Sequence, residues 1–226
     1  MQLSSFTMQV LKNFATVNSN IVIKPGSTIM TMSEAKNILG SATVEETFEK
    51  EFGIYDLSEF LSAMGLVDNP HLRFEDNFVK ITDASGRANI KYYYSSPEML
   101  TSPAKGITMP EADVSFTLDE TTLGNLKRAA GVLGHSELSI TPGSGCITLS
   151  VVASDNATSN VYSIDVDGEF KSDNFNFIMG INNLRMIPAS YQVDISSKLI
   201  SQFTSTDDGK DLKYWVALEK SSTFES

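Results

Sequence analysis

The spacing of apolar residues along the chain predicts two long amphipathic helices, each followed by strands. Apolar residues at helical spacing predict a helix from Ser4 or Ser5 to about Asn18. The same spacing predicts a helix over residues 119–133, which Gly134 ends. Most other segments alternate apolar and polar residues with a period of two, as strands do. The pattern therefore predicts an α+β chain.

Two shorter helices are expected within the strand-rich parts. Residues 56–67, DLSEFLSAMGLV, follow the apolar strand FGIY at 52–55. Residues 180–187, GINNLRMI, follow the apolar strand FNFIM at 175–179. The same succession of strand and short helix thus occurs twice along the chain.

Several sequence matches indicate an internal duplication. IKPGSTIMT at residues 23–31 and ITPGSGCIT at 140–148 agree at five of nine positions, 117 residues apart. GRANIKYYY at 86–94 matches GKDLKYWVA at 209–217, an offset of 122 to 123 with one residue gapped. Matches in one order and at similar spacing are the signature of a repeat.

We therefore predict two copies of one domain, residues 1–108 and 109–226. A connector at about 94–113, with three prolines and weak periodicity, would join them. In each copy, Pro-Gly-Ser is expected to form a hairpin turn between the first two strands after the long helix.

Charge and composition restrict the classes of function. The 28 acidic and 17 basic residues give a net charge of -11, which argues against an ordinary nucleic-acid binder with a basic surface. No apolar run approaches the ~20 residues that span a bilayer, and the N-terminus lacks a signal-peptide pattern. The single cysteine, Cys146, excludes an internal disulfide and fits a reducing compartment. We expect a protein that stays where it is made, without a membrane anchor.

The basic residues on the predicted helices lie off the apolar faces. Lys12 projects almost opposite the apolar stripe of the first helix, and Lys127 and Arg128 lie off the apolar face of the second long helix. Arg185 projects from the flank of the predicted helix 180–187. The helical carboxylates all belong to first turns: Asp56, Glu59, Asp119 and Glu120. Two interpretations remain open, namely ordinary solvating charges or a shared surface that faces a polyanion.

No pattern of catalytic or metal-binding residues is present in the sequence. His71 and His135 stand far apart, and neither an HExxH motif nor a cysteine pair occurs. The PGSG turn lacks the lysine and helix of a phosphate-binding loop, and DVDGE at 165–169 lacks the twelve-residue pattern of an EF-hand. We predict that the protein is not an enzyme and needs neither a metal nor another cofactor.

Four segments resemble the DNA polymerase sliding clamps, or processivity factors, of tailed bacteriophages with large genomes. They are VLKNFATVNSNIVIKPGSTIMT at 10–31, IYDLSEFL at 54–61, FNFIMGINNLRM at 175–186 and YWVALEKSSTF at 214–224. The resemblance implies two tandem copies of the clamp domain and a homotrimeric ring, with helices lining the interior and antiparallel sheets outside. It also implies a non-enzymatic clamp that encircles duplex DNA and tethers the replicative polymerase. An ATP-dependent clamp loader would open the ring in the cytoplasm of the infected bacterial host.

The resemblance also implies roles for particular residues. The residues expected to face the duplex are Lys12, Lys127, Arg128 and Arg185. Strand 90–94 is expected to pair with 161–165 of a neighbouring subunit, through Ile90, Tyr92, Tyr94, Val161, Ser163 and Asp165. The tyrosines also fit ordinary strand packing. An apolar pocket near the connector and the last long strand, expected to bind a polymerase tail peptide, would involve Ile107, Met109, Val216 and Leu218. Equally, these side chains fit the core.

A different class of function stays open on the residues alone. A β-rich viral structural protein, for example of a tail, would also contain duplicated domains that pack into a ring or tube. Such a protein has no need for helix faces without carboxylates, which favours the clamp.

Overall fold

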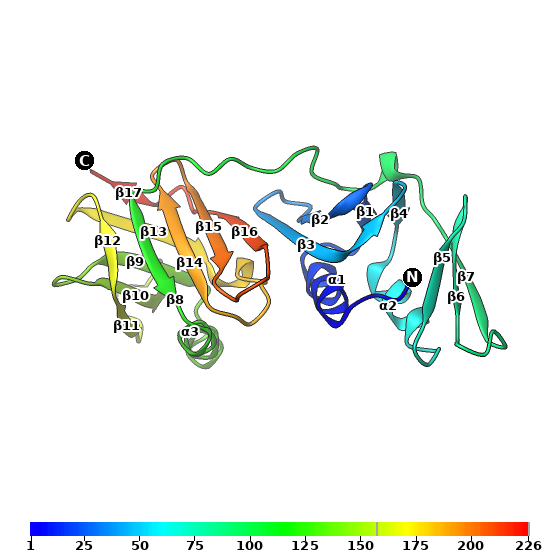
Figure 1. The fold of residues 1–226 in the computed structure, drawn as a ribbon. Helices are drawn as coiled ribbons and strands as arrows, with labels where there is room; N and C mark the ends of the chain where they lie inside the picture. The colour runs from blue at the N-terminus through cyan, green and yellow to red at the C-terminus, as the bar shows by residue number, and fades with distance from the viewer. Residues whose placement is uncertain (157, 226) are drawn as a thin grey trace. The chain divides into compact units, whose positions relative to one another are not determined.

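The computed structural model describes residues 1–156 and 158–225. Contacts divide the chain into two compact units, Met1–Gly106 and Ile107–Ser226. Figure 1 shows that each unit contains one long helix beside strands. Each unit is considered by itself below.

Unit 1 contains two α-helices and three small antiparallel sheets. Strand β1 pairs with β4, β2 pairs with β3, and β5, β6 and β7 form a three-stranded sheet. The elements in chain order are α1 (Ser5–Val17), β1 (Ile21–Ile23), β2 (Gly26–Met32), β3 (Ile38–Phe48), β4 (Phe52–Ile54), α2 (Leu57–Met64), β5 (His71–Phe74), β6 (Phe78–Thr82), β7 (Asn89–Tyr93) and the 3-10 helix η1 (Pro97–Met99).

Unit 2 contains one α-helix and two larger antiparallel sheets. One has the strand order β12-β8-β14-β15-β16, and the other has the order β11-β10-β9-β13-β17. The elements in chain order are β8 (Val114–Leu118), α3 (Glu120–Leu133), β9 (Glu137–Pro142), β10 (Ile147–Val152), β11 (Tyr162–Val166), β12 (Gly168–Phe170), β13 (Phe175–Gly180), the 3-10 helix η2 (Ile181–Asn183), β14 (Tyr191–Ser196), β15 (Ile200–Ser205), β16 (Leu212–Ala217) and β17 (Thr223–Phe224).

The two units share one topology, so they are similar domains. The long helices α1 and α3 stand at equivalent places, and the antiparallel pair β1–β4 corresponds to β9–β13. The pair β2–β3 corresponds to β10–β11, and β5-β6-β7 corresponds to β14-β15-β16. The expected α+β fold with two similar domains is confirmed.

Both long helices begin and end where the sequence indicated. Ser4 Oγ accepts a hydrogen bond from Thr7 N at 3.1 Å, which caps α1. Asp119 Oδ1 accepts one from Thr122 N at 2.8 Å, which caps α3. Gly134 ends α3 with a φ of 70°, a left-handed conformation that glycine adopts without steric cost. Local capping chemistry therefore defines both helices.

The helix predicted over residues 180–187 is wrong. Only the single 3-10 turn of η2 forms there, and Leu184 after it already leaves helical geometry, with a φ of -78° and a ψ of 50°. Two adjacent asparagines are poor helix formers, and Pro188 disfavours a helical conformation at the residue before it.

The hairpin predicted at Pro-Gly-Ser forms in unit 2 but not in unit 1. In unit 2, Pro142 pairs with Ile147 across a tight turn between β9 and β10. In unit 1, β1 and β2 flank the turn but pair with different strands, β4 and β3. The same Pro-Gly-Ser sequence therefore forms a hairpin turn in unit 2 but connects strands of two different sheets in unit 1. The difference arises because strand pairing depends on residues far away in the chain.

Each long helix is buried along one stripe and exposed along the other. Phe14 of α1 is fully buried and packs so closely on β3 that a Cβ on Gly40 would lie 2.8 Å from its ring. In α3, Leu126 is likewise fully buried. This packing leaves the opposite faces of α1 and α3 uncovered within their own units.

Candidate functional site

The exposed face of α1 carries one charged group. Ser5, Gln9, Lys12 and Thr16 are exposed, and the helix contains no carboxylate. Within the described residues, the Lys12 ammonium makes no ion pair. This face can therefore offer an unneutralised positive charge to an anion.

The two cations of α3 differ in environment. Arg128 is exposed, and its Nη1 donates to Asn125 Oδ1 at 3.2 Å. Lys127 is half-buried, and this burial lowers the pKa of its ammonium. The prediction that Lys127 lies clear of the apolar face thus holds only in part, whereas Arg128 is available to an external anion.

The carboxylates of α3 are confined to its start. Hydrogen bonds from Thr122 hold the pKa of Asp119 below its usual value, and Glu120 follows in the first turn. A carboxylate at this place stabilises the positive end of the helix dipole. In the described helices, no carboxylate occurs beyond the first turn.

Arg185 lies in the irregular segment after η2 rather than on a helix. Its side chain is exposed, and its Nε donates to the Asn182 carbonyl at 3.0 Å. Of the four basic residues singled out, Lys12 belongs to unit 1 and the others to unit 2, where Lys127 and Arg128 share one helix.

The predicted interface residues of β7 pack mainly within unit 1. Ile90 and Tyr92 are half-buried, and the Tyr92 hydroxyl lies 2.9 Å from Glu59 Oε2. Burial, followed by the Glu59 carboxylate, raises the pKa of Tyr92. Tyr93 points to the other face and is 65% exposed. Packing therefore explains Tyr92, while Tyr93 offers uncovered apolar surface.

Tyr94, directly after β7, is half-buried and stacks on Phe52 with ring centroids 5.0 Å apart. Burial raises the pKa of Tyr94 to about 12. Among the described residues its buried hydroxyl has no hydrogen-bond partner. The Tyr94 side chain, like that of Tyr92, therefore packs mainly inside unit 1.

The predicted residues near β11 lie on an exposed face. Val161 precedes the strand and is 55% exposed, and Ser163 and Asp165 are also exposed. The two polar side chains bond across the pair, Ser163 Oγ to Ser150 Oγ at 2.8 Å and Asp165 Oδ1 to Thr148 Oγ1 at 2.7 Å.

A groove of about 450 Å³ separates α3 from the start of β11. Its walls include Arg128, Val132, Leu133, Val161 and Tyr162. Val132 is 79% exposed and was not identified from the sequence, although a valine outside the apolar stripe of its helix was an available signal. Arg128 therefore borders both the exposed face of α3 and an apolar groove.

The four residues predicted to line a peptide pocket are not equally accessible. Ile107 is 38% exposed and Met109 is half-buried. Val216 is fully buried in β16, and Leu218 is 7% exposed. The structure places the last two in the core of unit 2, so Ile107 offers most of the surface of this group.

Within the described residues, no cluster of three potential metal ligands occurs. His135 Nε2 lies 2.7 Å from the Asn160 carbonyl, and His71 stands at the start of β5. Among the described residues, no helix is long and apolar enough to cross a membrane.

Comparison with known proteins shows the family. Residues 4–99 match the DNA polymerase processivity factor family, and residues 115–220 match the C-terminal domain of the gp45 sliding clamp family. The sliding clamp of Vibrio phage KVP40 is 32% identical over 224 residues, covering 97% of this chain and 99% of that protein. The sliding clamp of Enterobacteria phage T4 is 33% identical over 231 aligned residues, covering 99% of each.

Solved structures agree at the level of the fold. The proliferating cellular nuclear antigen of Entamoeba histolytica superposes with a TM-score of 0.68 at 13% identity, covering 94% of each chain. The PCNA2-PCNA3 complex of Sulfolobus tokodaii gives the same TM-score and identity. The family and sequence matches favour the clamp over the viral structural protein that the sequence left open. The chain belongs to the phage sliding clamp family of DNA polymerase processivity factors, which are accessory proteins and not enzymes.

Proposed function

We propose that three copies of this chain close head to tail into a ring around duplex DNA and hold the replicative polymerase on its template. The observation that carries the proposal is the charge of the long helices. In a chain of net charge -11, α1 and α3 carry only cations beyond their first turns. Lys12 and Arg128 lie on exposed faces, and Lys127 and Arg185 add to them.

Such a surface suits DNA that must slide. Each lysine or arginine near a phosphate releases counterions and adds a salt-sensitive increment of affinity that does not depend on sequence. The other exposed residues of α1 named above are uncharged, so this helix has no arginine that could make bidentate contacts with guanine. Acidic residues elsewhere would discourage DNA from binding outside the ring.

Ring closure would use the edges of two sheets. In the described structure β7 pairs only with β6, and β11 pairs only with β10. Pairing of β7 with β11 of a neighbouring subunit would remove both exposed edges. The groove beside β11 would then receive apolar side chains, of which Tyr93 is the most exposed on β7.

The partners follow from the same proposal. A tail peptide of the polymerase would dock near Ile107 and Met109, where apolar surface is exposed. A separate ATP-dependent loader would open the ring, because the sequence has no nucleotide-binding motif. The clamp would act in the cytoplasm of the infected bacterium.

The test of DNA contact is a fourfold change to alanine at Lys12, Lys127, Arg128 and Arg185. We expect normal folding and normal assembly but shorter products per binding event in a polymerase processivity assay at moderate salt. A matched control removes four exposed lysines outside the helices: Lys36, Lys105, Lys198 and Lys220. Processivity that stays unchanged in the helix variant, or falls equally in the control, would contradict the proposal.

A further inference from the structure

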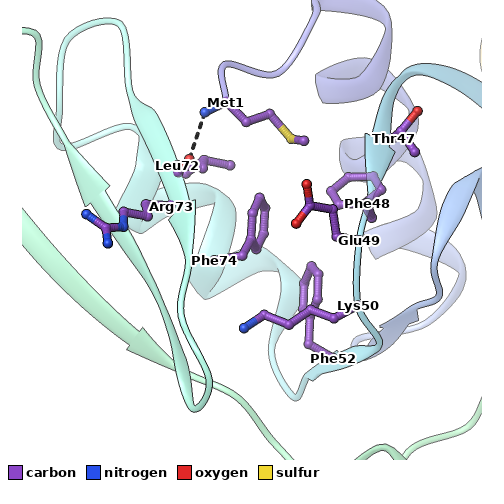
Figure 2. Close-up of a pocket in the computed structure, with 9 residues that line it drawn as sticks. All are labelled: Met1, Thr47, Phe48, Glu49, Lys50, Phe52, Leu72, Arg73 and Phe74. Atoms are coloured by element: carbon purple, nitrogen blue, oxygen red, sulfur yellow. Dashed lines mark hydrogen bonds between the residues drawn. The ribbon is translucent and has the colours of Figure 1, made fainter.

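The three-stranded sheet of unit 1 carries a row of three cations on its outward face. Arg73 of β5 lies opposite Lys80 of β6, and Lys80 lies opposite Lys91 of β7. Side chains of a strand alternate between its faces, and Figure 2 shows this on β5, where Arg73 points away from Phe74. Ile81, the next residue of β6, is fully buried on the other face. Neighbouring strands lie roughly 4.8 Å apart, so this cationic row is about 10 Å wide.

The side chains of the cationic row are accessible. That of Arg73 is 80% exposed, Lys91 is exposed and Lys80 is half-buried. Lys91 Nζ lies 5.2 Å from the centroid of the Phe78 ring on the same face. Among the described residues, neither lysine of the row makes an ion pair. Two ammonium groups of the row therefore lack a counter-charge.

The carboxylates nearest in sequence to the row are already engaged. Glu75 Oε1 lies 2.8 Å from Arg73 Nε and neutralises one end of the row. Asp76 Oδ1 lies 3.5 Å from Lys50 Nζ, at the turn after β3. Asp83 accepts hydrogen bonds within the turn that follows β6. The two lysines of the row thus remain for an anion from outside the unit.

The repeated topology does not require these cations. In unit 2 the matching row consists of Asp194, Gln202 and Trp215. Its polar groups bond within their own sheet: Asp194 Oδ1 accepts a hydrogen bond from Ser115 Oγ at 2.7 Å, and Gln202 Oε1 accepts one from Trp215 Nε1 at 2.9 Å. The cationic row is therefore a property of unit 1 and not of the fold.

The cationic row weakens its own sheet as long as no anion is bound. Like charges directly opposite each other on neighbouring strands are destabilising. Lys80 has a cation on both sides, Arg73 and Lys91. An anion laid across the row would relieve both contacts. A row of charges that costs stability and that the fold does not need points to a ligand.

We propose that the cationic row binds an acidic segment of a partner protein, which lies across the three strands. In an extended segment, carboxylates at every second position project to one side, roughly 7 Å apart. Two or three of them match the width of the row, and hydrogen bonds from ammonium and guanidinium groups to carboxylates are among the strong ones. The site does not depend on the ring, because it lies on the face of the sheet, whereas ring closure would use the backbone edge of β7.

A short acidic segment fits this place better than a nucleic acid does. Carboxylates border the row, since Glu75 and Asp76 follow β5 and Asp83 follows β6. The chain as a whole has a net charge of -11. A nucleic-acid strand that continued past the row would meet this negative surface, whereas a segment of a few residues ends within the row.

The first test uses a fluorescent peptide, Gly-Glu-Ser-Glu-Ser-Glu-Gly, with the full-length protein. We expect saturable binding by fluorescence anisotropy that weakens as salt is added, and shifts of the Lys80 and Lys91 amide signals by NMR. A peptide with glutamine in place of each glutamate should bind at least about tenfold more weakly, because it has lost its charges. Equal binding of both peptides, or shifts confined to α1 and α3, would overturn the proposal.

A single charge reversal locates the contact. Lys91→Glu should weaken binding of the Glu peptide about tenfold, since an attractive contact becomes a repulsive one. Lys105→Glu is the matched control, because it changes the net charge equally at an exposed position of the same unit. It should change the affinity by less than about twofold, since salt screens distant charges. Equal losses in the two variants would overturn the proposal.

Lys80→Glu tests the repulsion within the row without a ligand. This change turns two repulsive cross-strand contacts into attractive ones, so the midpoint of urea unfolding should rise while the affinity for the Glu peptide falls. Lys80→Gln keeps an aliphatic stem and removes only the charge, and should change both quantities in the same directions by less. A lower midpoint in both variants, or unchanged affinity in both, would overturn the proposal.

A short oligothymidylate tests the other class of polyanion. We expect it to bind the Lys91→Glu variant as well as the wild type, because its contacts would lie on the cations of α1 and α3. If it binds the wild type more tightly than the Glu peptide does, and Lys91→Glu abolishes that binding, the row is a nucleic-acid site and the proposal of an acidic protein segment is wrong.

Discussion

Replacing Val132 and Val161 together by aspartate should break the proposed ring. Both valines border the groove between α3 and β11, and they are 79% and 55% exposed within the chain. A neighbouring subunit that covers the groove would bury both side chains. The aspartates would instead place two charges in an apolar contact, at positions where the folded monomer already exposes the side chain. The substitution therefore tests assembly and not folding.

The size of the effect follows from these exposures. Complete burial of a valine side chain contributes roughly 1.5–3 kcal/mol, so covering the exposed parts of both contributes about 2–4 kcal/mol at each contact. Since 1.4 kcal/mol is a factor of ten, each contact should weaken by at least about 30-fold. A closed ring of three subunits contains three such contacts but forms in two association steps, so the concentration at half-assembly should rise by more than this factor.

Light scattering across a concentration series measures this effect directly. The wild-type protein should reach a mass near 74.1 kDa, three times the 24.7 kDa of one chain, while the variant stays near 24.7 kDa over the same range. Met99→Asp is the matched control, because Met99 is 84% exposed but lies outside the groove. A variant that assembles like the wild type would refute the interface, and a wild-type protein that stays monomeric throughout would refute the ring.

Three further predictions concern stability and partner binding. Glu46 is nearly buried and accepts hydrogen bonds from Thr7 and from the start of α1, so Glu46→Ala should cost roughly 1–3 kcal/mol in urea unfolding; an unchanged midpoint would contradict this role. Because the folded pKa of Asp119 is lowered, its stabilisation is present above the unfolded value and is lost as the pH falls through the folded value. Asp119→Asn should therefore reduce the acid sensitivity of unfolding below about pH 4, and an identical pH profile would refute this. Ile107→Asp with Met109→Asp should weaken binding of the polymerase more than assembly, which titration calorimetry and light scattering would separate; equal losses would remove the pocket assignment.

Local sequence was sufficient for the long helices and for the duplication. The caps Ser4 and Asp119 and the terminal Gly134 bond to their own neighbours in the chain, so their effect could be predicted without a fold. The exposure of Lys12 and Arg128 followed from helical periodicity alone. The repeat was visible because residues at turns and strand ends meet the same local requirements in both units.

Burial along strands could not be predicted in the same way. Val216 and Leu218 belong to an apolar segment whose exposure depends on which sheet covers it, and both lie in the core. Lys127 is half-buried because neighbouring elements cover part of its helix face, although the helix itself was correctly predicted. Periodicity locates an apolar face but does not show how far a neighbouring element extends over it.

By itself, the sequence determined the ends of the two long helices, the repeat and the helix faces free of carboxylates. Tertiary structure alone decided which strands pair, and therefore where pairing ends. The different partners of β1 and β2 and the groove beside Val132 both depend on such long-range pairing. Hydrogen bonds of a strand are made to distant residues, so an unpaired edge leaves no pattern in the residues that form it.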